Sequence, residues 1–226
     1  MHARGQPKGA KERIAQAIHC SLEIGLHCRE FSDVLEVQHP IRAESTRRTW
    51  WEIFIIDTLL AAVQVEGVLQ YTAETPDVPL PCKEDKYHDG RLPGVAMIVS
   101  DLGLYDIFSE HGDLSPFAYR VEAAIVLRRC LLASETHVSQ DSLDILDANI
   151  SAWFHRLPSC KRVILQPDGE VNELDLQATM IMHCASIYLH FPQVISALLP
   201  PEHRPDILLS SSSLYIYISK PPNALS

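Results

Sequence analysis

Apolar residues recur at intervals of three and four positions along most of this chain, a spacing typical of amphipathic helices. The clearest stretch runs from Glu44 to about Val65. Its apolar side chains fall on two adjoining faces, one with Trp50, Phe54, Ala61 and Val65 and the other with Trp51, Ile55, Thr58 and Ala62. The adjacent tryptophans widen the apolar surface, so we expect this helix at the centre of the core. Because no segment outside residues 214–218 reads convincingly as a strand, the sequence predicts an all-α fold.

Caps and turn residues divide the rest of the chain into further helices. The pattern predicts a helix from Lys11 to Cys28, with Gly25 near its end, and then a connection at Pro40. Residues 67–91 contain prolines and read as a long loop, and 159–171 read as a polar turn. Later helices are expected at residues 96–108, from Ser115-Pro116 past Leu132, from Ser139 or Asp141 to about Leu157, and from Glu173 to Leu189, where Pro192 stops or kinks the helix.

Charge and cysteine spacing argue against several kinds of function. The 226 residues carry a formal charge of −10, which disfavours nucleic-acid binding through phosphate contacts. The six cysteines are scattered without a Cys-x-x-Cys pair, which argues against a structural zinc site and against a disulfide scaffold. No apolar run reaches transmembrane length, so we expect a soluble intracellular protein with no membrane contact.

Five segments of the chain resemble one protein family, in the family's order. Residues 17–27 resemble a helix that ends in Gly-Leu-His, and residues 44–57 resemble the signature helix Arg-Arg-x-Trp-Trp-x-x-Phe-x-x-Asp. Residues 78–82, 153–158 and 182–192 are similar to a Leu-Pro-Cys loop, a Trp…Leu-Pro element and a late Leu-His-x-Pro helix. The family is the fungal-specific transcription factor domain, the middle regulatory region of zinc-cluster activators and repressors. The signature residues are Glu44, Arg47, Arg48, Trp50, Trp51, Phe54, Asp57, Leu80, Pro81, Cys82, Trp153, Pro158, His183, Leu189, His190 and Pro192.

The resemblance implies an irregular multi-helix regulatory domain over residues 14–200, after a disordered basic segment at 1–13 and before an irregular tail at 201–226. It implies transcription regulation in the nucleus, with protein partners that include a family member in a dimer, and an unidentified effector. In the family, zinc and DNA are bound by an N-terminal cluster of six cysteines that this sequence lacks, so no cofactor is expected here. Family helices before residue 14 and after Pro192 are also missing, so we expect an incomplete domain. A stand-alone interaction module is the alternative.

We expect the signature residues to build structure. Glu44 and Arg48 lie one helical turn apart and can form an ion pair, while Arg47 is placed to stack on an indole ring of the two tryptophans. Asp57 interrupts an apolar face and needs a cationic or hydroxyl partner. A regulatory pocket lined by the two tryptophans and Asp57 is the alternative to a core anchor, and paired aromatics at helical spacing favour the core.

Histidines and cysteines offer candidate metal ligands, but their spacing fits a metal site poorly. His183 and His190 lie two helical turns apart, about 10 Å, too far to share one ion, and they read as core or interface residues. The His19-Cys20 and His27-Cys28 steps also lack a tetrahedral spacing. We therefore predict no metal-binding residue.

Asp141, Asp144 and Asp147 invite comparison with helical isoprenoid enzymes, whose carboxylates hold magnesium. The paired-aspartate motif and the second magnesium box of such enzymes are missing. Three apolar neighbours are expected to face the core and leave the aspartates in solvent, namely Leu143, Ile145 and Ile150. We therefore predict no catalytic or cofactor-binding residue, with such an enzyme as a remote alternative.

Overall fold

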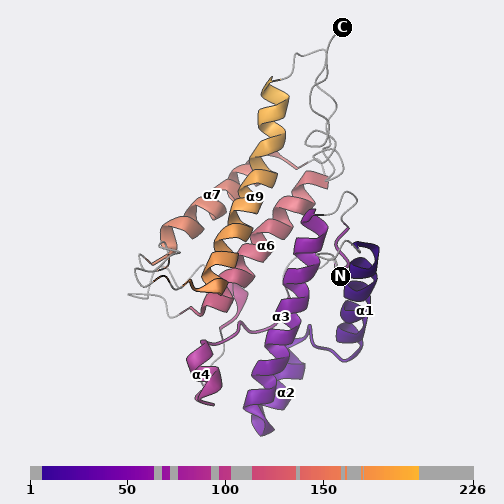
Figure 1. The fold of residues 1–226 in the computed structure, drawn as a ribbon, viewed down its shortest axis with the longest axis vertical. Helices are drawn as coiled ribbons and strands as arrows, with labels where there is room; N and C mark the ends of the chain where they lie inside the picture. Colours follow the sequence, from indigo (N-terminus) through magenta and orange to yellow (C-terminus); the bar gives the residue numbers. More distant parts are fainter. Residues whose placement is uncertain are drawn as a thin grey trace.

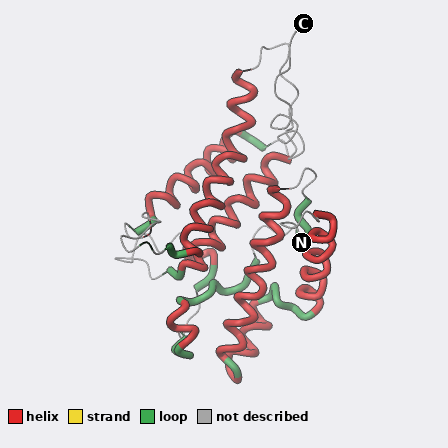
Figure 2. The backbone as a smooth tube through the Cα atoms, in the orientation of Figure 1, coloured by secondary structure: helices red, strands yellow, loops and turns green. Residues whose placement is uncertain are grey.

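The structure, a computed structural model, describes residues 7–63, 68–71, 76–92, 97–102, 114–135, 138–158, 161, 169 and 171–198. Their elements are α1 (Pro7–Glu23), α2 (Arg29–Gln38), α3 (Pro40–Val63), α4 (Glu84–His88), the 3-10 helix η2 (Val99–Asp101), α6 (Pro116–Glu135), α7 (Gln140–Arg156) and α9 (Glu173–Leu198). Among these residues β structure is limited to isolated bridges, such as that between Cys28 and Asp77. The predicted all-α fold is confirmed (Figure 1, Figure 2).

Helix α6 lies at the centre of the fold, between α3 on one side and α7 and α9 on the other (Figure 1). It packs most extensively against α9. From Phe117 to Leu131 its side chains are buried except those of Glu122 and Arg129, which are half-buried. A helix buried almost all round has little amphipathic character, so its neighbours surround it instead of covering one face.

Helix α3 forms the other half of the core, as predicted for the helix over residues 44–65. Ten of its side chains are buried, and the largest apolar ones are Trp50, Trp51, Phe54 and Ile55. The helix begins at Pro40, which we expected to mark a connection. Proline is well tolerated in the first turn of a helix, because the N–H group that it lacks would have no partner there.

The N-terminal helices differ from the prediction. Helix α1 begins at Pro7, so residues 7–13 are helical and do not form the disordered segment that we expected. Helix α1 ends at Glu23, before the predicted Cys28, and Gly25 follows at φ +79°: its N–H donates to the carbonyl of Leu22, and the N–H of Leu26 donates to that of Ser21. Helix α2 follows and was not foreseen, although Phe31, Val34 and Leu35 fall at helical spacing; it is only 10 residues long, and Ser32 is its only buried residue.

The starts of the two later helices follow the prediction. Ser115 caps α6, with its hydroxyl oxygen 3.0 Å from the N–H of Ala118, and Ser139 caps α7. Ile145 of α7 is 61% exposed, so its predicted core position was wrong. Helix α9 runs through Pro192 to Leu198, so Pro192 does not stop it; an internal proline removes one backbone hydrogen bond, which a helix of this length can lose.

The long loop predicted for residues 67–91 contains the short helix α4. Of the helix expected at 96–108, the described part forms only η2 and the following Leu102, and the rest lies outside the described residues. The tail after Leu198 and most of the polar turn at 159–171 also lie outside them. No helix in the described part is both long and apolar enough to cross a membrane.

Candidate functional site

A buried carboxylate, that of Glu44, joins the signature helix α3 to the Leu-Pro-Cys loop. The side chain is 1% exposed. One oxygen accepts hydrogen bonds from Arg48 Nε at 2.8 Å and from the N–H of Cys82 at 3.0 Å, and the other accepts from Arg47 Nε at 3.2 Å. Three donors compensate a charge that would be costly to bury alone. The predicted Glu44–Arg48 pair is confirmed.

Arg48 extends this cluster to α4. Its guanidinium donates to the carbonyl oxygen of Cys82 at 2.8 Å and to Glu84 at 2.6 Å, and it lies 4.3 Å from the centroid of the Tyr87 ring. Burial by itself lowers the pKa of Arg48, but hydrogen bonds to Glu84 and Glu44 outweigh burial, so the pKa is raised. The guanidinium therefore holds the loop and α4 against α3 as a permanent charge.

Arg47 pairs with carboxylates instead of stacking on a tryptophan, so that prediction was wrong. Its side chain is 3% exposed, and Nη1 donates to Glu36 of α2 at 2.8 Å. Because α2 was not foreseen, this second acid was missed. A charge-assisted hydrogen bond to a carboxylate is stronger than most contacts with a ring face, so the guanidinium turns towards Glu36.

Trp51 and Ser115 hold the same loop from the other side. Trp51 Nε1 donates to the carbonyl oxygen of Pro79 at 2.9 Å, and the Ser115 hydroxyl donates to that of Pro81 at 2.7 Å. Leu80, between these two prolines, is 4% exposed. The loop is therefore attached both to α3 and to the start of α6.

Asp57 forms a second buried ion pair, with Arg128 of α6. The carboxylate lies 2.6 Å from Nη2 of the guanidinium, and the side chains are 2% and 0% exposed. Asp57 also accepts from the N–H groups of Gln70 and Tyr71, at 3.1 and 3.3 Å. Burial lowers the pKa of Arg128, and the charge of Asp57 offsets part of this decrease. The cationic partner predicted for Asp57 is confirmed.

Sequence reasoning missed that this partner is Arg128, although a signal was present. An arginine interrupts an otherwise apolar run in α6 just as Asp57 interrupts α3, and two opposite charges in buried helices need each other. Arg128 also lies 4.1 Å from the ring centroid of Phe54, while Trp50 packs edge-on against Tyr71 at 5.0 Å. Asp57 and both tryptophans are at most 2% exposed and therefore lie in the core.

Cys82 does not fit a catalytic role. Burial and the nearby charge of Glu44 raise the pKa of its thiol to about 11. At neutral pH the sulfur is therefore protonated, and a protonated thiol is a poor nucleophile.

The late signature residues lie on α7 and α9. Trp153 is 1% exposed and packs edge-on against Tyr119 of α6, and Leu189 is also buried. His183 is exposed, whereas His190 Nε2 lies 3.0 Å from the carboxylate of Asp147 and so connects α9 to α7. Pro158 follows the end of α7, and Pro192 lies within α9.

The other candidate ligands lie apart or in solvent. His19 contacts Glu23 at 3.4 Å on an exposed face, and Cys28 Sγ lies 3.2 Å from His27 Nε2. Cys20 and the aspartates at 141, 144 and 147 are exposed. Within the described ranges, no three His, Cys, Asp or Glu side chains gather closely enough to hold a metal ion.

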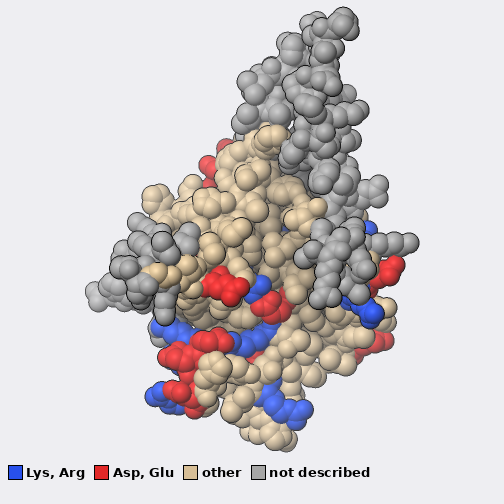
Figure 3. Space-filling view, in the orientation of Figure 1, with Lys and Arg blue, Asp and Glu red and all other residues tan. Residues whose placement is uncertain are grey.

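Charged side chains of both signs lie side by side on the face shown in Figure 3, mainly in the half that contains α4. The described atoms of this face carry no continuous basic surface of the kind that binds a phosphate backbone. The face over α9 is largely uncharged (Figure 3).

Comparison of this sequence with known proteins identifies the family to which it is related. The family model of the fungal specific transcription factor domain matches residues 5–120, about half of the chain. The chain belongs to this family. The C6 finger domain transcription factor iacK of Pestalotiopsis fici is 34% identical over 189 residues, which cover 83% of this chain and 28% of that protein. The chain thus spans little more than a quarter of the length of this relative. No solved structure matches.

The part matched by the fungal specific transcription factor domain contains the Glu44 cluster, the Leu-Pro-Cys loop and the start of α6. The aligned stretch of the C6 finger relative is longer than this part, so the likeness extends into the later helices. The resemblance read from the signature residues is therefore confirmed, and those residues that lie in the first part are buried or half-buried.

Proposed function

We propose that this chain is the helical regulatory part of a fungal zinc-cluster transcription factor and regulates transcription without catalysing a reaction. The match to the fungal specific transcription factor domain carries the proposal, and the relative that is a C6 finger domain transcription factor supports it.

The geometry supports a scaffold role for the signature residues. Glu44 fixes the Leu-Pro-Cys loop to α3, Arg47 fixes α2 to α3 through Glu36, and Asp57 fixes α3 to α6. Buried polar networks whose members all find partners specify one arrangement of their elements. A domain held in this way presents a defined surface to the rest of the factor.

In this proposal zinc and DNA are bound by a six-cysteine cluster, of the kind that the words 'C6 finger' in the name of the relative denote. The described residues offer no metal-ligand group, and a chain with a charge of −10 gains little from phosphate contacts. The proposed place of action is the nucleus.

Protein partners, with a second family member among them, are part of the proposal. Met180 and Ile187 of α9 are 59% and 54% exposed and lie two turns apart on one face, with His183 between them. Exposed apolar side chains grouped in this way favour contact with another protein. Light scattering of the purified chain over a range of concentrations tests for a dimer, and a monomer throughout would remove self-association from the proposal.

A reporter assay in a fungal host tests the regulatory function. The 226-residue chain is inserted between an unrelated DNA-binding domain and a strong activation domain, and a flexible linker of equal length serves as the reference. We expect the chain to lower reporter output, because a regulatory domain restrains the parts attached to it. Arg42→Gln, on an exposed position of α3, should retain this effect, and the destabilised Asp57→Asn should lose it. Equal output from chain and linker, at equal nuclear protein levels, would contradict the proposal.

A further inference from the structure

The turn between α1 and α2 brings a thiol and an imidazole together. Cys28 Sγ lies 3.2 Å from Nε2 of His27, which is within hydrogen-bond distance for a sulfur atom. The other ring nitrogen, Nδ1, is buried and has no hydrogen-bond partner in the part of the chain that the structure describes. The imidazole is therefore directed at the thiol, and a nucleophile next to a base that can take its proton is the usual arrangement of reactive cysteines.

The fold holds this pair in a fixed place, where α1 and α2 both meet α3 (Figure 1). The His27 ring packs against the ring of Trp50, with 5.8 Å between the two centroids. Cys28 is the N-cap residue of α2, but its side chain makes no capping hydrogen bond, so the sulfur is not used to hold the helix. The positive end of the helix favours the negative charge that a thiol acquires when it reacts.

Tyr71 supplies a hydroxyl close to the pair. Burial raises the pKa of Tyr71, the charge of Arg128 opposes part of that rise, and the neighbouring Cys28 adds to it. The phenol is therefore protonated at neutral pH and is a hydrogen-bond donor. The backbone of Tyr71 contacts the second buried ion pair, because its N–H donates to Asp57 and its carbonyl oxygen accepts from Arg128. Cys28 thus interacts with a residue that is attached to the buried core.

Three of the other cysteines lack a base and stay protonated. Burial raises the pKa of the Cys82 thiol to about 11 and that of the Cys130 thiol to about 12. Burial also raises the pKa of Cys184. Because the thiolate is the nucleophile, these three side chains react slowly at neutral pH.

Cys20 provides a comparison within the same chain. It also follows a histidine, and its side chain is exposed. However, Nε2 of His19 lies 3.4 Å from the carboxylate of Glu23, one helical turn further on. Of the two His-Cys steps in the sequence, the structure therefore joins the imidazole to the thiol only at His27 and Cys28.

We propose that Cys28 is a site of covalent modification by small α,β-unsaturated carbonyl compounds, with His27 as the base. The sulfur adds to the β-carbon, so an S–C bond forms while the π bond of the alkene breaks. The thiol proton passes to His27 Nε2 and then, through solvent, to the α-carbon, so the addition needs neither an oxidant nor a reductant. The oxygen of the intermediate enolate can accept a hydrogen bond from the Tyr71 hydroxyl. This site goes beyond the proposed function and does not depend on it.

Labelling of the purified 226-residue chain with acrylamide at pH 7 tests the site, because acrylamide is a small, uncharged member of this class. Cleavage after Glu23 places Cys20 and Cys28 in different peptides, and mass spectrometry gives the modified fraction of each over time. We expect Cys28 to react about tenfold faster than the more exposed Cys20, which is a small part of the roughly 100-fold or more that a positioned base contributes in enzymes.

His27→Gln should lower the rate at Cys28 to about the rate at Cys20, because glutamine cannot take the thiol proton. His19→Gln, the matched change in the other His-Cys step, should leave the rate at Cys28 unchanged. Cys130 is 1% exposed, so it stays unlabelled in a folded chain and reports any variant that unfolds. Should His27→Gln unfold, the comparison of Cys28 with Cys20 in the unchanged chain decides. A rate at Cys28 no higher than that at Cys20, or equal effects of the two histidine changes in folded variants, would overturn the proposal.

Discussion

Replacing Asp57 by asparagine tests whether the buried pair with Arg128 holds α3 to α6. The change keeps the shape of the side chain, but it leaves a guanidinium that is 0% exposed without its neutralising charge. Removing one partner of a buried ion pair costs about 3–5 kcal/mol. The other contacts of Arg128, with Thr58, Phe54 and the carbonyl of Tyr71, involve neutral groups and do not replace that charge. We therefore expect the free energy of unfolding to fall by an amount in that range.

Urea unfolding followed by tryptophan fluorescence and circular dichroism gives this free energy if both signals change together. Glu52→Gln is the matched control. Glu52 of α3 also pairs with an arginine of α6, Arg120, but its side chain is 38% exposed. Solvent reaches Glu52 although Arg120 is only 9% exposed, so the control should cost less than Asp57→Asn, whose two partners are both buried.

A double-mutant cycle shows whether the loss comes from the pair itself. Arg128→Met removes the other charge and should also be costly, since it leaves the Asp57 carboxylate buried. The double variant should cost clearly less than the sum of the two single changes, by about 1–3 kcal/mol, because it leaves no unpaired charge. Additive costs, or an Asp57→Asn variant no less stable than Glu52→Gln, would refute the reasoning.

Three further changes test the core, a helix end and a buried thiol. Trp51→Ala should cost about 3–5 kcal/mol, since the side chain is 0% exposed and its loss leaves the Pro79 carbonyl without a donor; an unchanged urea midpoint would place Trp51 outside the core. Gly25→Ala should cost about 1–2 kcal/mol, because φ is +79° and the new Cβ meets no close atom, so only the backbone strain counts. Gly9→Ala within α1 should instead stabilise the protein by up to about 1 kcal/mol, because alanine favours a helix more than glycine does. A change in stability of the same sign for both variants would contradict this. Burial raises the pKa of Cys130 to about 12 from 9.0. Above pH 9 the unfolded chain loses this proton while the folded chain keeps it, so stability falls by about 1.4 kcal/mol per pH unit. The stability lost by Cys130→Ala should accordingly shrink between pH 8 and pH 11 in urea unfolding, and a constant loss would show that the thiol does not contribute.

Sequence periodicity predicted the elements whose burial is one-sided or whose caps are explicit. The central position of α3 and the caps Ser115 and Ser139 could be read directly, because each depends on residues close together in the chain. Helix α2 was missed although Phe31, Val34 and Leu35 fall at helical spacing, because a helix of 10 residues shows only one repeat of that pattern. The continuation of α9 through Pro192 also escaped prediction, because propensity near one proline is weaker than the packing of a long helix.

The partners of the signature charges were predictable only when they lie on the same helix. Glu44 and Arg48 are four residues apart, so helical geometry alone pairs them. The partner of Asp57 is Arg128, 71 positions away, and its identity depends on how α3 packs against α6. The same applies to Glu36 of α2, which pairs with the Arg47 guanidinium that we expected to stack on a tryptophan. Sequence showed that a partner was required, and tertiary packing determined which residue supplies it.

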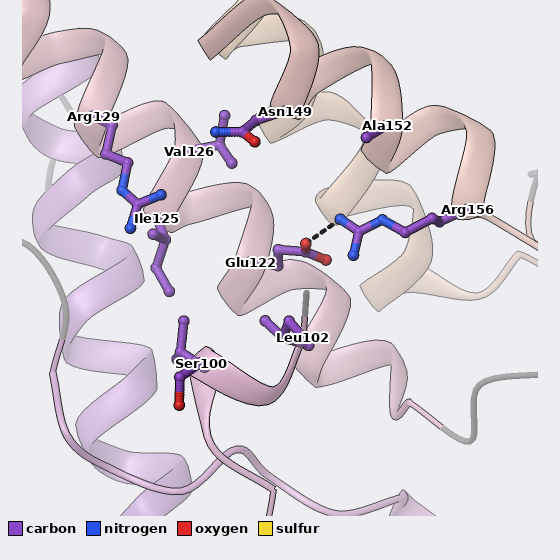
Figure 4. A pocket seen from close by; sticks show the side chains of 10 residues that line it. Ser100, Leu102, Glu122, Ile125, Val126, Arg129, Asn149, Ala152 and Arg156 are labelled. Carbon is purple, nitrogen blue, oxygen red and sulfur yellow. Dashed lines mark hydrogen bonds and ion pairs between the residues drawn. The ribbon is translucent and has the colours of Figure 1, made fainter. Parts of the chain in front are cut away.

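The buried signature residues are a different set from the side chains that solvent reaches. The side chains of Glu44, Trp51 and Asp57 are at most 2% exposed, so a small molecule cannot reach them without unfolding the core. A contact with a small molecule or with a partner protein must instead be made by side chains that solvent reaches. Between Phe117 and Leu131 of α6 these are Glu122 and Arg129, which share one face of the helix (Figure 4). Both side chains are half-buried, whereas that of Arg128, next to Arg129 in the chain, is 0% exposed, so the buried signature network and the accessible positions of α6 are separate sets of residues.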